Sequence, residues 1–282
     1  MTRAIGEAER TAFAQQGYVV LESVIGAADL AMLRRECAVF VERTDAWLAE
    51  RGTDVFGITH RGKRYFISNR YRDSADLPQF VFGETMRAIT TAFLGETVYL
   101  FNEQWVVKGA EQGMKFAWHQ DSGYVRFNDP GNQHRPYLTC WCALDDMSAS
   151  NGTISVMPHD RVGSRNTVFP HRREEGTNDL VGYEGDDPGE LIEMPAGSVA
   201  VFSSTSLHRS GPNTTDRWRR VYLTQYSAER IRSTQGDLWG QGVPFVEDGE
   251  LVYDPATDVA GPMPQWLRAR RRRAGVSTKN SQ

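Results

Sequence analysis

Short runs of β-forming residues, separated by Gly, Pro, Asn and Asp, make up most of the chain after Gly95. They cover residues 98–107, 116–118, 138–144, 153–157, 191–194, 198–202 and 219–226. This spacing is typical of an antiparallel sandwich or barrel, because each run is long enough for one strand and each break can form a turn. A chain of 282 residues, 40% of them apolar, can bury one large core of this kind. We therefore expect a mainly β fold.

The first hundred residues follow a different pattern. Apolar positions recur every three or four residues from Ala27 to Glu50, which predicts an amphipathic helix. A short strand is expected at residues 17–21, and a second helix is expected from Phe80 to Leu94, where Gly95 can end it. We expect a single domain over residues 1–282, with a mixed N-terminal support at 1–97, a β core at 98–230 and a C-terminal extension at 231–282.

Composition and charge exclude several classes of partner. The net charge of -4 gives no overall attraction to nucleic acid or to an anionic membrane surface. No window approaches the roughly 20 apolar residues that cross a bilayer, and the polar N-terminus does not resemble an export signal. The three cysteines, Cys37, Cys140 and Cys142, are expected to be free thiols in a reducing cytoplasm. A solvated basic tail is expected at 268–273, and a surface loop at 171–189.

A His-x-Asp pair indicates half of a metal site. His119 and Asp121 are two positions apart, which places both side chains on one face of a strand. Of the four downstream histidines, 134, 159, 171 and 208, only His208 follows a strongly β-patterned run. Two imidazoles and one carboxylate form a facial triad that leaves three coordination positions open, an arrangement that suits iron(II) in oxygenases. A structural histidine remains the alternative for His208.

An arginine follows eleven residues after His208. Arg219 begins the next β run, and an arginine buried there needs an anionic partner. If the open metal positions take the 2-oxo acid end of 2-oxoglutarate, Arg219 can bind the far carboxylate with two N–H groups, and Ser210 can add a hydroxyl bond. Arg217 and Arg220 are neighbouring candidates, and two of these three arginines are expected to be ordinary surface charges.

These residues carry a resemblance. The segments Gln104 to Asp121, Trp141 to Pro158, and His208 to Arg219, with a weaker match near Gly17, resemble the phytanoyl-CoA dioxygenase family. The resemblance implies a double-stranded β-helix core of the jelly-roll or cupin-like type with flanking α-helices. It also implies that iron is held by His119, Asp121 and His208, and that Arg219 binds 2-oxoglutarate. By the same resemblance Ser210 would assist Arg219, while Gln104 and Trp141 would line the co-substrate or substrate side.

The resemblance also implies a reaction. Iron(II), 2-oxoglutarate and dioxygen would be used to oxidise an unactivated C–H bond of a small molecule, usually to an alcohol, with succinate and carbon dioxide as co-products. Desaturation, ring closure or epoxidation would use the same residues. The chain departs from the family pattern in the loop at 129–134, which is enlarged, and in the turn at 157–160. Such loop differences bear on the substrate rather than on the iron chemistry.

Three alternatives compete with this hypothesis. A halogenating relative would lack the ligand carboxylate, so the presence of Asp121 disfavours it. A non-catalytic protein that binds or senses 2-oxoglutarate could use the same barrel, and a substrate-dependent release of succinate would distinguish the two. Nucleic-acid demethylation is disfavoured by the acidic net charge, although the basic tail prompts it.

The substrate is the least constrained part of the hypothesis. Residues 60–72 are basic and aromatic and are predicted either to close over the iron as a lid that grips an anionic small molecule or secondary metabolite, or to be a solvated loop. Within this segment Arg64 and Arg70 are candidate substrate contacts, and Tyr124 and Arg126 are candidates by their position after the His-x-Asp pair.

Overall fold

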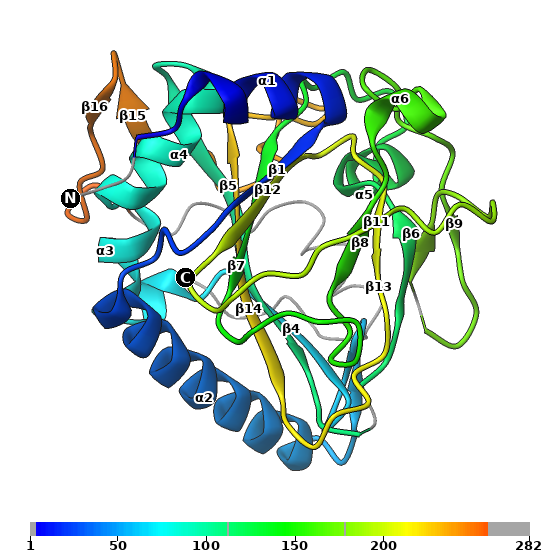
Figure 1. The fold of residues 1–282 in the computed structure, drawn as a ribbon. Helices are drawn as coiled ribbons and strands as arrows, with labels where there is room; N and C mark the ends of the chain where they lie inside the picture. Colours follow the sequence, from blue (N-terminus) through cyan, green and yellow to red (C-terminus); the bar gives the residue numbers. More distant parts are fainter. Residues whose placement is uncertain (1–3, 112, 178, 259–282) are drawn as a thin grey trace.

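Two antiparallel sheets face one another in the computed structural model, which describes residues 4–111, 113–177 and 179–258 (Figure 1). The strands of the large sheet follow the order β1-β12-β7-β14-β5-β4-β3-β2, and β15 adds to β5 and carries β16. They are β1 Tyr18–Leu21, β2 Val55–Phe56, β3 Thr59–His60, β4 Arg64–Ser68, β5 Val98–Lys108, β7 Leu138–Ala143, β12 Val199–Ser203, β14 Arg219–Ser227, β15 Val243–Glu247 and β16 Glu250–Leu251.

The small sheet has the order β11-β8-β13-β6, and a separate hairpin pairs β9 with β10. Their bounds are β6 Phe116–His119, β8 Ile154–Val156, β9 Arg172–Arg173, β10 Leu180–Val181, β11 Glu190–Leu191 and β13 His208–Ser210. The two facing sheets form the expected jelly-roll type of double-stranded β-helix, so the mainly β fold class is confirmed. Side chains of both sheets point into the space between them, where the candidate site lies.

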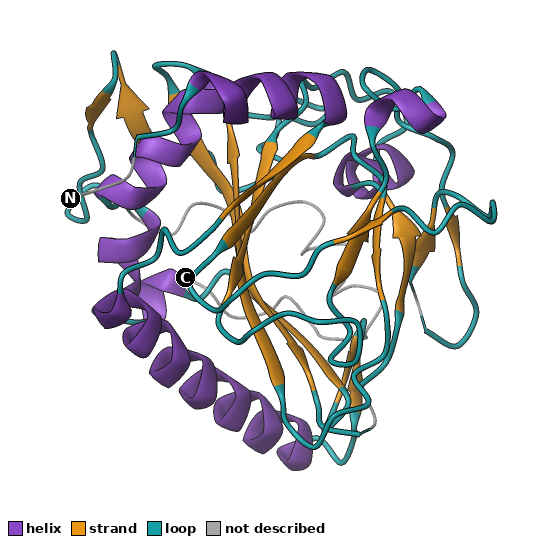
Figure 2. Cartoon of the chain, in the orientation of Figure 1, coloured by secondary structure: helices purple, strands orange, loops and turns teal. Residues whose placement is uncertain are grey.

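Helices cover the outer face of the large sheet (Figure 2). They are α1 Glu7–Gln16, α2 Ala27–Glu50, the 3-10 turn η1 Tyr71–Asp73, α3 Leu77–Val81 and α4 Glu84–Leu94, while α5 Asp121–Asn128 and α6 His159–Val162 lie near the small sheet. The apolar stripe of α2, which includes Leu33, Cys37 and Phe40, packs with Trp105 of β5 in the main core. The prediction of a helix over Ala27–Glu50 is confirmed.

Three local predictions were wrong. The helix expected from Phe80 to Leu94 is divided into α3 and α4 at Gly83, whose backbone leaves the helical region and which approaches the carbonyl of Gln79 too closely for a Cβ. The loop expected at 171–189 contains the β9–β10 hairpin, which buries Leu180. The segment at 60–72, expected to be a lid or a solvated loop, contains strand β4, an inner member of the large sheet, and the start of the 3-10 turn η1.

The error at 60–72 has a physical reason. In β4 the side chains of Tyr65 and Ile67 face the helix-covered core, and those of Arg64, Phe66 and Ser68 face the other side of the sheet, as the alternation of a strand requires. Arg64 is fully buried on the other face. The basic residues masked this period, because a charge at a strand position usually indicates solvent.

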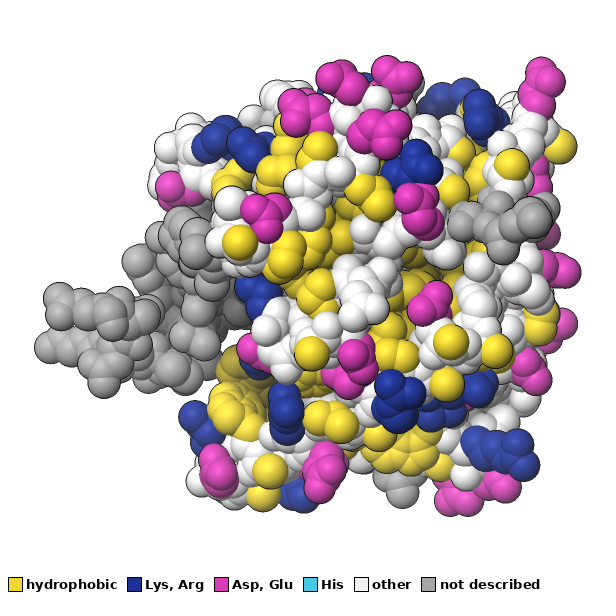
Figure 3. All heavy atoms as spheres, turned by 90° about the vertical axis from the view of Figure 1, so that its left-hand side faces the viewer, with side chains coloured by type: hydrophobic (Ala, Val, Ile, Leu, Met, Phe, Trp, Pro, Cys, Tyr) yellow, Lys and Arg dark blue, Asp and Glu magenta, His cyan; other side chains and the backbone are white. Residues whose placement is uncertain are grey.

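No helix in the described part of the chain is long and apolar enough to cross a membrane. Figure 3 shows acidic and basic side chains intermixed over one outer face of the molecule. The cysteines Cys37, Cys140 and Cys142 are buried free thiols. The basic tail expected at 268–273 lies outside the described residues.

Candidate metal centre

His119, Asp121 and His208 come together at one end of the small sheet. Antiparallel pairing of β13 with β6 places His208 directly opposite His119. Asp121 is the first residue of α5, because the extended backbone of Gln120 ends the strand and begins the helix. The Oδ1 atom of Asp121 lies 3.9 Å from Nε2 of His119 and 3.8 Å from Nε2 of His208. All three ligand atoms lie within 4.8 Å of one another, as a single metal ion requires.

Hydrogen bonds fix which nitrogen each imidazole presents. Nδ1 of His119 lies 2.8 Å from the carbonyl of Ala117, and Nδ1 of His208 lies 3.2 Å from that of Ser206. Each Nδ1–H therefore donates to the backbone and leaves Nε2 as the lone-pair donor. Burial, followed by the effect of His208, holds the pKa of His119 well below its usual range. A neutral imidazole is the form that binds a metal.

The carboxylate of Asp121 is oriented by two donors. Its Oδ2 accepts hydrogen bonds from Oγ1 of Thr139 at 2.6 Å and from Nε2 of Gln225 at 3.0 Å. Gln225 is held in turn by Asn102, whose amide donates to Oε1 of Gln225. With Oδ2 satisfied in this way, Oδ1 is the oxygen that faces the two imidazoles.

Gln120, the middle residue of the His-x-Asp motif, joins the segments that carry the ligands. Its side chain is fully buried and donates to the carbonyls of Thr167 and Thr205, while its Oε1 accepts from the N–H of Phe169. Thr205 lies three residues before His208, so this one amide ties both halves of the triad. Gln120 was not predicted to be a site residue, because its place inside the motif is its only signal in the sequence.

His171 supports the same turn from the other side. Its Nε2 accepts the backbone N–H of Gln120 at 3.0 Å, and its Nδ1 lies 2.8 Å from the carbonyl of Phe169. The ring fills the space beside Gly123, where a Cβ would overlap it. His171 therefore supports the ligand turn without being part of the triad.

Three buried cations form a row on the cavity side of the large sheet. Lys108 of β5 is paired in register with Arg64 of β4 and with Arg219 of β14. Their exposed fractions are 1% for Lys108, 0% for Arg64 and 1% for Arg219. Adjacent strands lie about 5 Å apart, so the charges are close enough to repel strongly in a buried setting.

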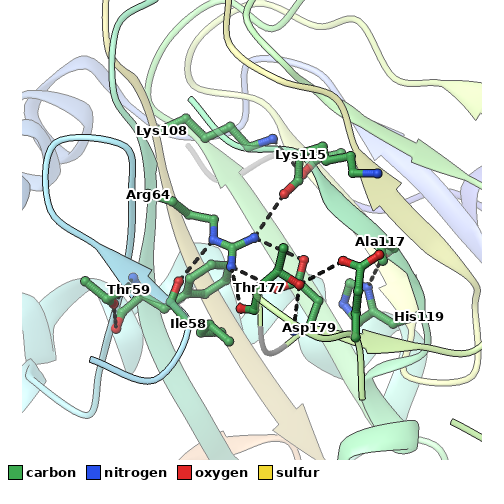
Figure 4. Close-up of polar contacts among 12 residues, drawn as sticks. Ile58, Thr59, Arg64, Lys108, Lys115, Ala117, His119, Thr177 and Asp179 are labelled. Atoms are coloured by element: carbon green, nitrogen blue, oxygen red, sulfur yellow. Dashed lines mark hydrogen bonds and ion pairs between the residues drawn. The ribbon is translucent and has the colours of Figure 1, made fainter. Parts of the chain in front are cut away.

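Arg64 has a complete set of protein partners (Figure 4). Its guanidinium forms a two-pronged ion pair with Asp179, at 2.8 and 3.1 Å. The remaining donors reach the carbonyls of Ile58, Lys115 and Thr177. All five N–H groups of Arg64 are thus used within the protein. Asp179 also accepts the N–H of Ala117, whose carbonyl orients His119.

Arg219 has no such set. Within the described residues its guanidinium donates only to the carbonyls of Val106 and Gly152, at 3.4 and 3.2 Å, and it lies over the ring of Trp141. Its Nε has no partner, and no ion pair joins Arg219 to a carboxylate among the described residues. Burial lowers the pKa of Arg219 to about 9. A buried cation with unused donors beside a cavity is a site for an anionic ligand.

A cavity of about 580 Å³ joins the triad to Arg219. Five further residues predicted from the sequence line this cavity, namely Arg64, Gln104, Trp141, Ser210 and Tyr124. Gln104 accepts a hydrogen bond from Ser68, the hydroxyl of Ser210 meets Lys108, and the ring of Tyr124 packs edge-on against His119. The cavity lies in the usual range for small-molecule sites, roughly 300–1,000 Å³.

Two of the selected arginines lie elsewhere. The side chain of Arg70 is half exposed, forms an ion pair with Asp73 and does not border the cavity in the described part of the chain. Arg126 lies on α5 but is also absent from the described cavity wall. Burial is the main cause that lowers the pKa of His134, and the charge of Arg126 is the second. Arg64 does border the cavity, but its donors are already used.

The enlarged loop at 129–134 is tied to the C-terminal segment. The carboxylate of Asp129 accepts hydrogen bonds from Asn132, Thr234 and Trp239. Although burial raises the pKa of Asp129, these bonds lower it to about 2. Trp239 itself borders the cavity, so this loop helps to position part of the cavity wall.

The arrangement can hold a metal ion and an anionic chelator together. Three ligands on one face leave open positions toward the cavity, and Arg219 lies within the same cavity to receive a second charged group. The donor set of two imidazoles and a carboxylate fits iron(II), and the unpaired guanidinium fits the far carboxylate of 2-oxoglutarate. Fold and site together define a non-haem metal oxygenase of the jelly-roll class.

Comparison with known proteins specifies the family. The family model for phytanoyl-CoA dioxygenase (PhyH) matches residues 13–221. The chain belongs to the phytanoyl-CoA dioxygenase family. It is an iron(II)- and 2-oxoglutarate-dependent dioxygenase, and its cofactors are iron(II) and 2-oxoglutarate.

Two curated relatives act on small phosphorus compounds. A probable alpha-ketoglutarate-dependent hypophosphite dioxygenase of Stutzerimonas stutzeri is 32% identical over 168 residues, which cover 56% of this chain and 54% of that protein. The chain thus aligns with about half the length of that relative. A methylphosphonate hydroxylase of Gimesia maris is 26% identical over 247 residues, covering 84% of this chain and 85% of that protein.

Among solved structures, EctD from S. alaskensis with 2-oxoglutarate and 5-hydroxyectoine has a TM-score of 0.64 and 22% identity, and the match covers 83% of this chain and 80% of that one. This likeness supports the fold.

Proposed function

We propose that the protein oxidises a C–H bond of a small organic anion, with iron held by His119, Asp121 and His208 and the far carboxylate of 2-oxoglutarate bound by Arg219. The supporting observation is the charge of the cavity wall. Among the described residues five basic side chains and one carboxylate border the cavity, in a chain whose net charge is -4. The carboxylate is Asp121, and the basic residues are Arg64, Lys108, Arg173, Arg209 and Arg219.

Not all of these charges are available to a substrate. Asp179 neutralises Arg64, and Arg219 is assigned to the co-substrate. Arg173 of β9 and Arg209 of β13 come from different elements at the cavity wall, and Arg209 lies over the ring of Trp118. A concave site with an excess of one charge raises the local concentration of the opposite ion. The two relatives that act on hypophosphite and methylphosphonate are consistent with an anionic substrate.

The rest of the wall favours an organic body rather than a bare inorganic ion. Phe101, Tyr137 and Trp239 form an aromatic group at the cavity, and the rings of Phe101 and Tyr137 lie 4.4 Å apart. Aromatic rings contribute large apolar contact areas. An anion with an apolar portion would use both kinds of wall.

In the mechanism, the protein positions groups and excludes water. When bound, iron(II) with 2-oxoglutarate and dioxygen supplies the oxidising power that removes a hydrogen atom from carbon, with succinate and carbon dioxide released. Thr139 and Gln225 hold the Asp121 carboxylate, and the backbone holds both imidazoles with Nε2 toward the cavity. Arg219 fixes the co-substrate end, and the aromatic wall shields the reacting carbon from solvent.

A succinate assay with matched compounds tests this function. Organic phosphonates and carboxylates would be compared with neutral amides or esters of the same shape, and methylphosphonate and hypophosphite would be included. We expect anions to stimulate succinate formation and neutral analogues to fail. Arg173→Ala and Arg209→Ala should raise the KM for the active anion but not that for 2-oxoglutarate, and Arg217→Ala, an exposed residue outside the cavity, is the control. Equal stimulation by neutral analogues would contradict the proposal.

A further inference from the structure

Lys108 is a buried amine that the proposed mechanism does not use. Its Nζ contacts the hydroxyl of Ser210 at 2.8 Å and the carbonyl of Gly211, both of which are neutral groups. It lies between Arg64 and Arg219 in the row of cations, and Asp179, the carboxylate of that region, is already paired with Arg64. Within the described residues, Lys108 and Arg219 are therefore two neighbouring buried cations with no carboxylate of their own.

Two such charges are costly without an anion. An arginine keeps its proton in proteins, whereas a buried lysine can lose its proton and become neutral. An uncharged amine fits the observed contacts, because Nζ donates only to the hydroxyl of Ser210 and to the carbonyl of Gly211 in the described part of the chain, and a neutral amine has two N–H groups. Burial, then the charges of Arg219 and Arg64, hold the pKa of Lys108 well below its usual range, and Asp179 opposes this only partly.

We propose that Lys108 is the second cation of the co-substrate carboxylate site and that it takes up a proton when 2-oxoglutarate binds. The proposal rests on the proposed function, in which the far carboxylate lies at Arg219. That carboxylate brings a negative charge beside Lys108, which removes the reason for the amine to be neutral. Ser210 links the two cations, since its hydroxyl can bond the carboxylate while the ammonium bonds the hydroxyl.

The sign of the pH dependence follows from this coupling. The pKa of Lys108 is lower in the empty site than in the occupied site, so binding takes up a proton at any pH between the two values. In that interval the affinity for 2-oxoglutarate should fall as pH rises, by up to about tenfold per pH unit. The groups that face Lys108 are Arg64 on β4, Arg219 on β14, Ser210 on β13 and Asp179 beside β10.

Calorimetry of the full chain loaded with Mn(II), which does not support turnover, measures the proton directly. The heat of 2-oxoglutarate binding would be recorded in buffers of different ionisation enthalpy, at neutral and mildly alkaline pH. Wild type should take up close to one proton per 2-oxoglutarate. Lys108→Arg should bind with an affinity within about threefold of wild type and take up none, because its charge is permanent. Lys108→Met should bind at least about tenfold more weakly, also without proton uptake.

Lys115→Arg, a change at an exposed lysine that does not border the cavity in the described part of the chain, is the control and should match wild type. Urea unfolding of each variant shows whether the fold is retained. Binding without proton uptake in wild type, or equal uptake in Lys108→Arg, would overturn the inference while leaving the proposed function intact. A wild-type protein that binds Mn(II) but no 2-oxoglutarate would instead contradict the proposed function, and the inference with it.

Discussion

Arg64 and Arg219 are two buried arginines on the same face of one sheet, with opposite surroundings. Arg64 uses every donor within the protein and is neutralised by Asp179. In the part of the chain that the structure describes, Arg219 contacts only two carbonyls and a ring, and its Nε has no partner. The two arginines are equally buried but have different roles. Arg64 holds segments of the protein together, whereas Arg219 has N–H donors that remain available to an anionic ligand.

Loss of the Arg64 counter-ion and loss of the Arg219 charge should have opposite effects on the free energy of unfolding, and we expect this difference to be larger than those that follow. Asp179→Ala leaves Arg64 buried without a counter-ion, so the free energy of unfolding should fall by about 3–5 kcal/mol. Arg219→Met removes a charge that has no protein partner, so stability should be unchanged or higher by up to about 4 kcal/mol. Urea unfolding without 2-oxoglutarate measures both. A large loss of stability in Arg219→Met would mean that Arg219, like Arg64, holds the fold together.

His159, a buried histidine outside the triad, also has a charged state that burial disfavours. His159 is 4% exposed, and burial, followed by Arg165, lowers its pKa to about 4. Because its folded-state pKa lies below the unfolded value, its contribution to stability is complete above pH 6.5 and is lost as pH falls toward 4. His159→Gln should remove up to about 3 kcal/mol of this acid sensitivity. The free energy of unfolding of both proteins would be measured between pH 4 and pH 7. If it falls equally in His159→Gln and in wild type as pH decreases, His159 is not the source of the acid sensitivity.

The smallest expected effect distinguishes Arg219 from its neighbour in sequence. Arg219→Ala should raise the apparent constant for 2-oxoglutarate at least about tenfold, the scale of a lost charge-assisted pair. Arg220→Ala should change it little, because Arg220 points to the other face and pairs with Asp145. Steady-state succinate formation at varied 2-oxoglutarate measures both constants. A larger effect from Arg220→Ala would mean that the side of the strand facing the co-substrate was assigned incorrectly.

The mainly β fold could be predicted from the periodicity of short β runs. The candidate metal ligands could be predicted from the His-x-Asp spacing and from a histidine that follows a β run. His119, Asp121, His208 and Arg219 could be selected because each lies in or beside a strongly β-patterned run. Partners supplied by distant segments could not be selected in this way. Asp179 lies in a stretch expected to be a loop, and nothing in its sequence neighbours indicates that it neutralises Arg64 115 residues away.

For the same reason the basic segment at 60–72 was assigned the wrong structure. Its charges suggested solvent or substrate, whereas the register of β4 against β5 buries Arg64 beside Lys108. Gln120 was missed because a buried amide whose partners come from residues 167, 169 and 205 has no local pattern. Local signals therefore located the metal centre, and tertiary contacts decided which charges serve structure and which serve binding.

Anaerobic addition of iron(II) and then 2-oxoglutarate shows whether the three proposed ligands hold the metal, because chelation of iron by the 2-oxo acid produces a visible charge-transfer band. We expect the band to form in wild type and in His159→Ala and to be lost in His119→Ala, Asp121→Ala and His208→Ala. Retention of the band in His208→Ala together with its loss in His159→Ala would mean that His159, and not His208, is the distal ligand.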